Sequence, residues 1–379
     1  MRIAHVLTYI SADGAFGGPL AVLSEQTQEL ARRGHHVEVF AGWDGRARFA
    51  PTDVEAHLFP VRRAVPGAGF SGLVAPGLRR ALRRRRAEFD VVHVHLARDL
   101  VTTPVAFSLR RSSHPRLFLQ PHGMVKPDRR PRARLWDVWI RRILAHADGT
   151  FSLTDVDTQR LRDVESRVRL LDLPNGVGVP AAGTGSGKER TEVLFLARLH
   201  ARKRVLLFVD AALQLLAEGI DADFVIVGPD EGELGEVTQR IAEAGRQDRI
   251  RYEGAVPPGA GRDRIARADV YVLPSLNEPF PMSVLEALSV ATPTVISETC
   301  HIADRLGDAV AAFPESAPDT AAALAGSLRT LLADPAQRAA LGRRGRQAIE
   351  SRFSIERVGD LLERYYAHGA LGEAPRTLR

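Results

Sequence analysis

The residues best suited to do chemistry in this chain are two glutamates, Glu278 and Glu286, with seven residues between them. Pro279 and Pro281 forbid a helix before about Met282, so we predict a loop that carries Glu278 and a helix that carries Glu286 about one turn inside. The free backbone N–H groups at such a helix start attract anions, and a carboxylate accepts hydrogen bonds from paired sugar hydroxyls. The stretch therefore predicts a polyol site, although a helix with one solvated glutamate has the same spacing.

A second group of chemically useful residues is a pair of cations upstream. Arg198 and Lys203 are five positions apart in a loop that follows the apolar run 192–196, which we predict to be a strand. Two cations on one such loop can converge on a diphosphate. A loop whose charges are only solvated is the alternative interpretation.

Two histidines also follow predicted strands. His122 comes directly after the strand 116–120, and His95 ends the strand 91–95. Because ligands bind at the carboxyl ends of strands in open α/β sheets, both side chains are candidates for substrate contact. We hold His95 as a candidate on the acceptor side only.

The elements that position these residues begin with a strand over residues 2–9, a glycine-rich loop over 13–19, a helix over 20–33 and a strand over 36–40. This order is the βαβ start of a Rossmann-like domain. It lacks the G-x-G-x-x-G pattern of dinucleotide-binding loops. Gly17 and Gly18 let a backbone approach a ligand, and Pro19 opens the helix, which suits a diphosphate or a sugar there. A plain turn is the alternative.

Four segments, taken in chain order, resemble retaining GT-B glycosyltransferases of family four, the glycosyl transferases group 1. They are Leu-Pro-Asn-Gly at 173–176, Ala-Arg-Leu-His-Ala-Arg-Lys at 197–203, Val-Gly-Pro-Asp-Glu-Gly at 227–232, and the Asn-Glu-Pro-Phe stretch that runs from 277 into Ala-Leu-Ser-Val-Ala-Thr-Pro-Thr-Val-Ile-Ser. The resemblance covers nearly the whole chain. Its motifs are specific for fold and reaction type but not for substrate.

The resemblance implies an α/β fold of GT-B architecture, in which two Rossmann-like domains face a central cleft and a C-terminal helix crosses back to the first domain. It implies a sugar donor that is a nucleotide diphosphate sugar, used as a co-substrate without a metal ion or another cofactor. It assigns catalytic roles to His122, Arg198, Lys203 and Glu278, and it assigns donor binding to Gly17, Gly18, Gly228, Pro279, Phe280 and Glu286. One departure is Pro281, which stands where the family usually has glycine and which cannot donate a backbone hydrogen bond.

The length of 379 residues and the composition fit two soluble globular domains, because 45% of the residues are apolar and 26% are charged. We predict an N-terminal acceptor-binding domain over 1–178, a linker over 179–190, a nucleotide-sugar-binding domain over 191–353, and a terminal helix within 354–379 that packs on the first domain. No apolar run reaches the roughly 18 residues that span a bilayer, and no signal segment opens the chain, which predicts a cytoplasmic protein.

Charge is divided unevenly between the two predicted domains. Residues 1–178 hold 28 Lys/Arg and 18 Asp/Glu, whereas residues 179–379 hold 24 and 28. Six arginines crowd the predicted helix at 78–89, namely Arg79, Arg80, Arg83, Arg84, Arg85 and Arg86. This helix is either a solvated face or a peripheral contact with the anionic inner face of a membrane. A second cluster, Arg129 to Arg134, is a candidate contact for an anionic acceptor.

The predicted function is therefore the transfer, with retention, of a hexose-type sugar to an acceptor that the sequence does not identify: a small molecule, a glycan or a lipid-linked compound. A GT-B epimerase of nucleotide sugars or a phosphorylase is an alternative. A non-catalytic protein whose basic domain binds membrane or nucleic acid is another. We expect no nucleic-acid partner, because no aromatic residues are interleaved with the arginines to stack on bases.

Overall fold

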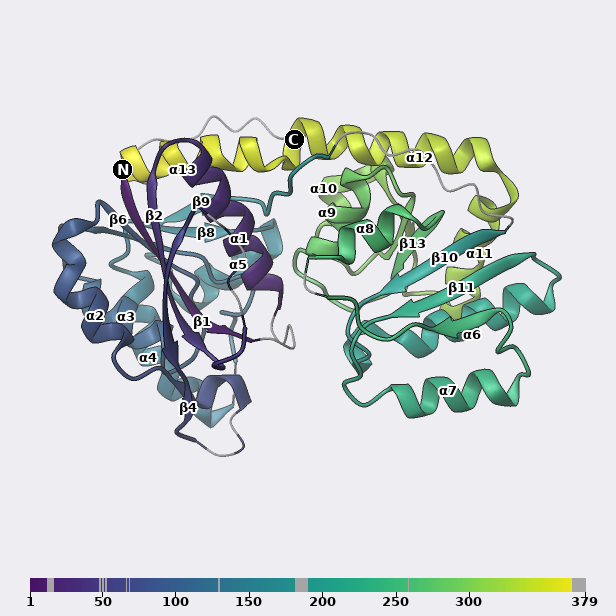
Figure 1. The fold of residues 1–379 in the computed structure, drawn as a ribbon, viewed down its shortest axis with the longest axis horizontal. Coiled ribbons are helices and arrows are strands. Elements are labelled where there is room, and N and C mark those ends of the chain that lie inside the picture. The colour runs from purple at the N-terminus through teal and green to yellow at the C-terminus, as the bar shows by residue number, and fades with distance from the viewer. Residues whose placement is uncertain are drawn as a thin grey trace. The chain divides into compact units, whose positions relative to one another are not determined.

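The computed structural model describes residues 1–11, 17–47, 49, 51, 53–65, 67, 69–128, 130–180, 190–257 and 259–369. The chain forms two compact units, one of residues 1–176 together with the C-terminal segment from Ile355, the other of Val177–Ser354. Each unit is built around a parallel sheet (Figure 1). Most of the predicted linker, residues 181–189, lies outside the described residues, so its bounds remain a prediction.

The sheet of the first unit is seven-stranded and parallel, in the order β3-β2-β1-β6-β7-β8-β9. Its strands are β1 (Arg2–Ile10), β2 (His36–Trp43), β3 (Glu55–Pro60), β6 (Val91–Val94), β7 (Arg116–Leu119), β8 (Gly149–Ser152) and β9 (Leu170–Asp172), and a separate antiparallel pair consists of β4 (Arg62–Arg63) and β5 (Leu73–Val74). The central strands are buried on both faces, as is usual when helices cover a parallel sheet on both sides. The predicted βαβ start is confirmed, since β1 pairs with β2.

Helices cover both faces of this sheet. One face packs against α2 (Leu78–Arg85), α3 (Thr102–Leu109), α4 (Pro131–Leu144) and α5 (Asp155–Val164), and the other packs against α1 (Gly17–Arg32) and α13 (Ile355–His368). Leu362, Tyr365 and Tyr366 of α13 are buried in the second of these cores. The prediction that the terminal helix packs on the first domain is therefore confirmed.

The first helix, α1, begins earlier than predicted. We expected it to start at Leu20, after a glycine loop, but Gly17 and Gly18 already belong to its first turn. Pro19 is tolerated there because the first N–H groups of a helix have no partner inside the helix. The two glycines therefore supply helix-terminal N–H groups rather than a loop.

The second unit has a six-stranded parallel sheet in the order β12-β11-β10-β13-β14-β15. Its strands are β10 (Thr191–Leu196), β11 (Ala222–Val227), β12 (Ile250–Tyr252), β13 (Val270–Leu273), β14 (Thr294–Ser297) and β15 (Ala311–Phe313). Its helices are α6 (Val205–Ala217), α7 (Leu234–Glu243), α8 (Gly261–Ala266), α9 (Met282–Ser289), α10 (Ala303–Leu306), α11 (Thr320–Ala333) and α12 (Pro335–Ala348). The predicted helix start at Met282 is confirmed.

Both sheets reverse their strand order next to their first strand. In the second unit the chain moves from β10 outward to β12 and then returns to place β13 on the other side of β10. The loops after β10 and β13 therefore leave the same sheet edge in opposite directions, and such a switch point is where open α/β sheets bind ligands. The loop after β10 carries Arg198 and Lys203, and the loop after β13 carries Glu278.

Candidate active site

The ion pair between Lys203 and Glu278 lies across this switch point. Lys203 Nζ is 2.7 Å from Glu278 Oε2, and both side chains are only 13% exposed. A backbone hydrogen bond joins the two loops, because the N–H of Leu276 donates to the carbonyl of Arg202. The carbonyl of Glu278 accepts from the N–H of His301, which lies in the loop after β14. The structure thus brings together two residues that are 75 positions apart in sequence.

Burial gives the ammonium group of Lys203 an unusual electrostatic setting. Burial lowers the pKa of Lys203, and the neighbouring Glu278 carboxylate opposes that shift. Arg202 adds a weaker contact, since its Nη2 atom lies 3.5 Å from Glu278 Oε2 and its side chain is 48% exposed. A buried cation whose partner is one carboxylate is well placed to meet a second anion.

Arg198 lies in the same loop but binds a different partner. Its Nη1 atom donates to both carboxylate oxygens of Glu231, at 2.6 and 2.8 Å. Glu231 belongs to the loop after β11, which runs beside the loop after β10 through a short bridge between Leu199 and Asp230. The structure therefore places Arg198 and Lys203 on one loop with separate acidic partners.

Gly228 has a structural reason to be glycine. Its φ is +148°, and a Cβ atom there would lie 1.9 Å from the carbonyl oxygen of Ala197. Only glycine lets the loop after β11 approach the loop after β10 this closely. The nearby Asp230 carboxylate accepts N–H bonds from Gly232 and Leu234 and so shapes its own turn.

The residues around α9 are in different environments. Phe280 is 6% exposed and packs edge-on against Phe353, so its ring belongs to the core of the unit. Pro279 lies in the loop and Pro281 caps the helix, while Glu286 is half-buried with its carboxylate facing Gly261 of α8. Of these, Glu286 offers a polar side chain, and Phe280 can meet a ligand only through its backbone.

His122 lies on a left-handed turn at the end of β7 in the first unit. Its φ is +53° and that of Gly123 is +71°. His122 Nε2 lies 2.8 Å from His95 Nδ1, and the two rings are stacked with their centroids 5.0 Å apart. Burial lowers the pKa of His122 to about 3, so the imidazole is neutral at physiological pH.

His95 is not an acceptor contact, contrary to our expectation. It is only 1% exposed, and its second ring nitrogen, Nε2, lies 3.1 Å from His5 Nδ1. His95 lies one residue past the end of β6, and its ring stacks on that of His93, whose Nδ1 atom is 2.6 Å from the Tyr366 hydroxyl of α13. His95 therefore contacts protein on both sides of its ring.

Three buried histidines of the first unit lie close enough together to be considered as a metal site. The ring nitrogens of His5, His93 and His95 lie within 4.8 Å of one another. However, the rings of His93 and His95 are stacked, with an angle of 4° between their planes. Both ring nitrogens of His95 already take part in hydrogen bonds, Nε2 with His5 and Nδ1 with His122, so His95 has no lone pair left for an ion. The cluster fits stacking and hydrogen bonding better than metal binding.

Two family models match the chain. One, described as glycosyl transferases group 1, matches residues 182–348, and the other, a glycosyl transferase 4-like domain, matches residues 17–176. The chain belongs to the glycosyl transferases group 1. The predicted GT-B fold is confirmed as well, since solved GT-B glycosyltransferases cover nearly all of the chain.

Among curated relatives, the glycosyltransferase resembles a D-inositol 3-phosphate glycosyltransferase of Kineococcus radiotolerans, with 27% identity over 87% of this chain and 86% of the relative. It also resembles a 2-deoxystreptamine glucosyltransferase of Streptomyces kanamyceticus, with 26% identity over 75% of this chain and 78% of the relative. Among solved structures, Anabaena HepE in complex with UDP and glucose superposes with a TM-score of 0.76 at 17% identity, covering 97% of this chain and 99% of that one. That likeness shows the fold.

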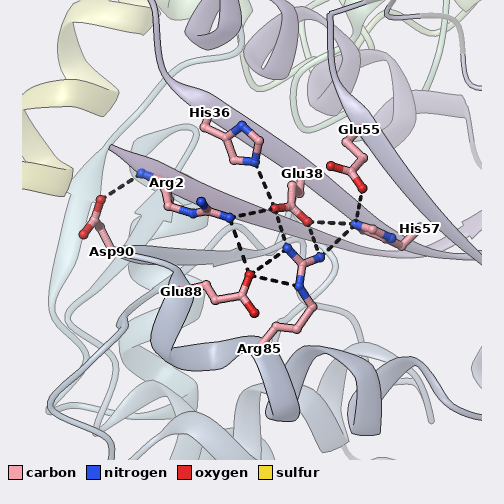
Figure 2. Close-up of polar contacts among 8 residues, drawn as sticks. All are labelled: Arg2, His36, Glu38, Glu55, His57, Arg85, Glu88 and Asp90. Atoms are coloured by element: carbon pink, nitrogen blue, oxygen red, sulfur yellow. Dashed lines mark hydrogen bonds and ion pairs between the residues drawn. The ribbon is translucent and has the colours of Figure 1, made fainter.

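The arginines of helix α2 in the glycosyltransferase fall into two groups, one paired with acidic residues and one exposed. Arg85 binds both oxygens of Glu38, at 2.6 and 2.9 Å, and also binds Glu88 (Figure 2). Arg85 is therefore not available to a ligand, which corrects our grouping of all six arginines as one contact surface. The other five, Arg79, Arg80, Arg83, Arg84 and Arg86, are exposed and form no ion pair with a described residue.

The second arginine cluster is described only in part. Arg129 and the side chains of Arg132 and Arg134 lie outside what the structure describes, and Arg130 pairs with Asp128 at 2.5 Å. Its role toward an acceptor remains a prediction. No helix among the described residues is both long and apolar enough to cross a membrane.

Sequence reasoning missed two partners of the candidate residues. The pairing of Glu231 with Arg198 joins residues 33 positions apart, on loops that follow different strands, and no local pattern indicates it. His5, which binds His95, had a signal that was overlooked, because His5, His93 and His95 occupy inward positions of strands that pair in register. Alternation along the strands predicts that three polar rings would be buried together.

Proposed function

We propose that this chain is a retaining glycosyltransferase that moves a hexose-type sugar from a nucleotide diphosphate sugar to an acceptor, without needing a metal ion. The observation that carries the proposal is the buried Lys203–Glu278 pair at the switch point of the second sheet, with Arg198 on the same loop. A cation for phosphate and a carboxylate for sugar hydroxyls then lie side by side. The UDP-glucose complex of HepE, which shares this fold, supports a nucleotide-sugar donor.

Lys203 and Arg198 have the role of stabilising the leaving group. As the bond between the sugar and the diphosphate breaks, negative charge grows on the β-phosphate, and a preorganised cation near it is worth roughly 3 kcal/mol. Lys203 is already desolvated and held by Glu278, so it meets that charge with little reorganisation. The N–H groups at the start of α9 add to the positive potential.

The remaining residues hold the donor. Glu278 accepts hydrogen bonds from sugar hydroxyls, Glu286 binds the ribose, and His122 contacts the sugar. Gly228, Pro279 and Phe280 shape the donor loop through their backbone, and Gly17 and Gly18 offer N–H groups of the first turn of α1 to the diphosphate. Pro281 removes one donor N–H from the α9 turn, so we expect fewer backbone contacts to the sugar there than the family usually makes.

For the acceptor, we propose a small polyol that carries negative charge. The two curated relatives carry the names of an inositol phosphate and of an aminocyclitol. The first unit is strongly basic, and a field of that sign attracts an anionic ligand in preference to a cationic one. An inositol phosphate is therefore favoured over an aminocyclitol.

A panel of nucleotide sugars tests the proposed function. We expect one donor to raise the melting temperature and to be slowly hydrolysed, with excess chelator present throughout. Added inositol phosphate should then give a glycoside with the donor's anomeric configuration, and uncharged inositol should react more slowly. Sugar epimerised without acceptor would show an epimerase, sugar 1-phosphate would show a phosphorylase, and activity that appears only after manganese is restored would contradict metal independence.

We also propose that the exposed arginines of α2 contact an anionic membrane surface. Five exposed arginines that have no acidic partner in the described part of the chain repel one another, and a contact with anionic lipid relieves that repulsion at about 1 kcal/mol per charge. A hollow of about 320 Å³, lined largely by apolar side chains, adjoins Arg79 and Arg80 at the start of this helix. On the same face of the sheet, α4 exposes Val138 and Trp139, and tryptophan favours the lipid interface.

Vesicle binding tests the membrane contact. We expect the protein to bind anionic vesicles at low salt and to leave them at high salt, and not to bind neutral vesicles. Changing Arg83, Arg84 and Arg86 to glutamine should weaken binding at least tenfold. The matched control changes Arg240, Arg267 and Arg343 of the second unit, which removes the same charge and should have little effect. Equal weakening in both variants would indicate only a net-charge effect, and binding to neither vesicle type would exclude the membrane contact.

A further inference from the structure

Three histidines of the first unit, His5, His95 and His122, form a hydrogen-bonded chain that ends at His122. His5 lies on β1, His95 follows β6 and His122 follows β7. Two bonds join them, His5 Nδ1 to His95 Nε2 at 3.1 Å and His95 Nδ1 to His122 Nε2 at 2.8 Å. His5 and His95 are buried, whereas His122 is half-buried, and its Nδ1 atom has no hydrogen-bond partner among the described residues.

Only two arrangements of the ring protons are compatible with both hydrogen bonds of this row of histidines. Burial lowers the pKa of all three rings, so each is neutral and carries one N–H and one lone pair. Each of the two bonds needs one proton between its nitrogens. Both bonds exist together only when all three protons sit on Nε2 or all three sit on Nδ1. In the first arrangement His122 Nδ1 accepts a hydrogen bond from a ligand, and in the second it donates one.

His5, the buried end of the row of histidines, favours the second arrangement, with all three protons on Nδ1. His5 Nε2 is buried and has no hydrogen-bond partner among the described residues. With the protons on Nε2, this atom would be a buried N–H without an acceptor, and such groups are rare in folded proteins. With the protons on Nδ1, it is a lone pair. The environment of His5 thereby selects the proton position on His122, two rings away.

We propose that His95 and His5 are positioning residues that hold the proton of His122 on Nδ1, so that His122 donates a hydrogen bond to an oxygen of the bound sugar. The proposal rests on the proposed function, in which His122 contacts the sugar of the donor. A fixed donor makes the site selective, since a sugar that lacks this oxygen leaves the His122 N–H unpaired. The deoxy analogue of the donor should therefore react more slowly than the parent sugar.

Nitrogen NMR of the histidine-labelled protein tests the proton positions directly. We expect the His122 Nδ1 signal to be that of a protonated ring nitrogen and the Nε2 signal to be that of an unprotonated one. His5→Leu removes the link and should let His122 populate both tautomers, with about a tenfold fall in kcat/KM for the donor. His5→Asn keeps a polar group near the position of Nδ1 and should restore both the NMR pattern and most of the rate.

Two further variants complete the experiment. Tyr366→Phe removes a hydrogen bond to His93, which stacks on His95 but is not in the chain, and it should change neither readout. If His5→Leu does not fold, His95→Asn breaks the same link while keeping a polar group toward His122. A parent protein with His122 protonated on Nε2 would overturn the proposal. So would an unchanged His122 tautomer in folded His5→Leu, or in His95→Asn where that variant takes its place. If His122→Ala leaves transfer intact, the sugar contact fails, while the NMR result still decides the proton positions.

Discussion

Replacing Lys203 with alanine is expected to lower the turnover number of sugar transfer at least 100-fold. Losing one preorganised cation at a leaving group costs roughly 3 kcal/mol of transition-state stabilisation, which corresponds to that factor. The effect should fall mainly on kcat, because the charge on the β-phosphate is largest in the transition state. Steady-state kinetics with the donor found in the nucleotide-sugar panel would measure it.

The matched control for this prediction is Arg202→Ala. Arg202 lies in the same loop and also faces Glu278, but its side chain is 48% exposed and 3.5 Å away, so we expect less than a tenfold effect. Arg198→Ala should resemble Lys203→Ala in direction. Circular dichroism and the melting temperature of each variant separate a lost charge from a lost fold. Turnover close to that of the parent in both Arg198→Ala and Lys203→Ala would remove these residues from the mechanism.

Features encoded within one short segment could be predicted from the sequence. The helix start at Met282 followed from two prolines, and the βαβ start of the first sheet followed from alternating apolar residues and a glycine-rich turn. The ordering of motifs along the chain predicted the fold. These are local patterns, and local patterns are visible without knowing which strands are neighbours.

Contacts between distant segments could not be predicted in the same way. The His5–His95 bond depends on β1 pairing with β6, whose residues lie about 90 positions away. The bond between Arg85 and Glu38 spans 47 positions, so α2 looked uniformly basic when viewed alone. The start of α1 was misplaced for another reason, since glycines before a proline are typical of both a loop and a first helical turn.

Replacing Glu38 with glutamine is expected to lower the free energy of unfolding by about 1–3 kcal/mol at pH 7, because an amide replaces the buried carboxylate that accepts charge-assisted hydrogen bonds from Arg85. Glu38 is fully buried and is contacted by Arg2, His36, His57 and Arg85 (Figure 2). These contacts join β1, β2, β3 and α2, so the carboxylate anchors the arginine-rich helix to the sheet. Chemical denaturation of parent and variant would measure the difference.

The pH dependence of the free energy of unfolding provides a second test of the role of Glu38. Burial alone would raise the pKa of Glu38, but hydrogen bonds from Arg85, His57 and His36 outweigh it, and the pKa lies below its ordinary value of 4.5. A carboxyl group with a lowered pKa stabilises the fold above its unfolded-state pKa and loses that contribution as the pH falls through the folded-state value. The stability difference between parent and Glu38→Gln should therefore be full at pH 7 and shrink only below about pH 4.5.

Glu88→Gln is the control that separates burial from pairing. Glu88 binds the same guanidinium, at 2.8 Å, but its side chain is 45% exposed, so we expect its loss to lower stability much less than the loss of Glu38. Because both variants remove a negative charge near Arg85, any difference between them reports the burial of Glu38. If Glu38→Gln is as mild as Glu88→Gln, then solvent reaches Glu38, and packing against the sheet, rather than this ion pair, holds α2 in place.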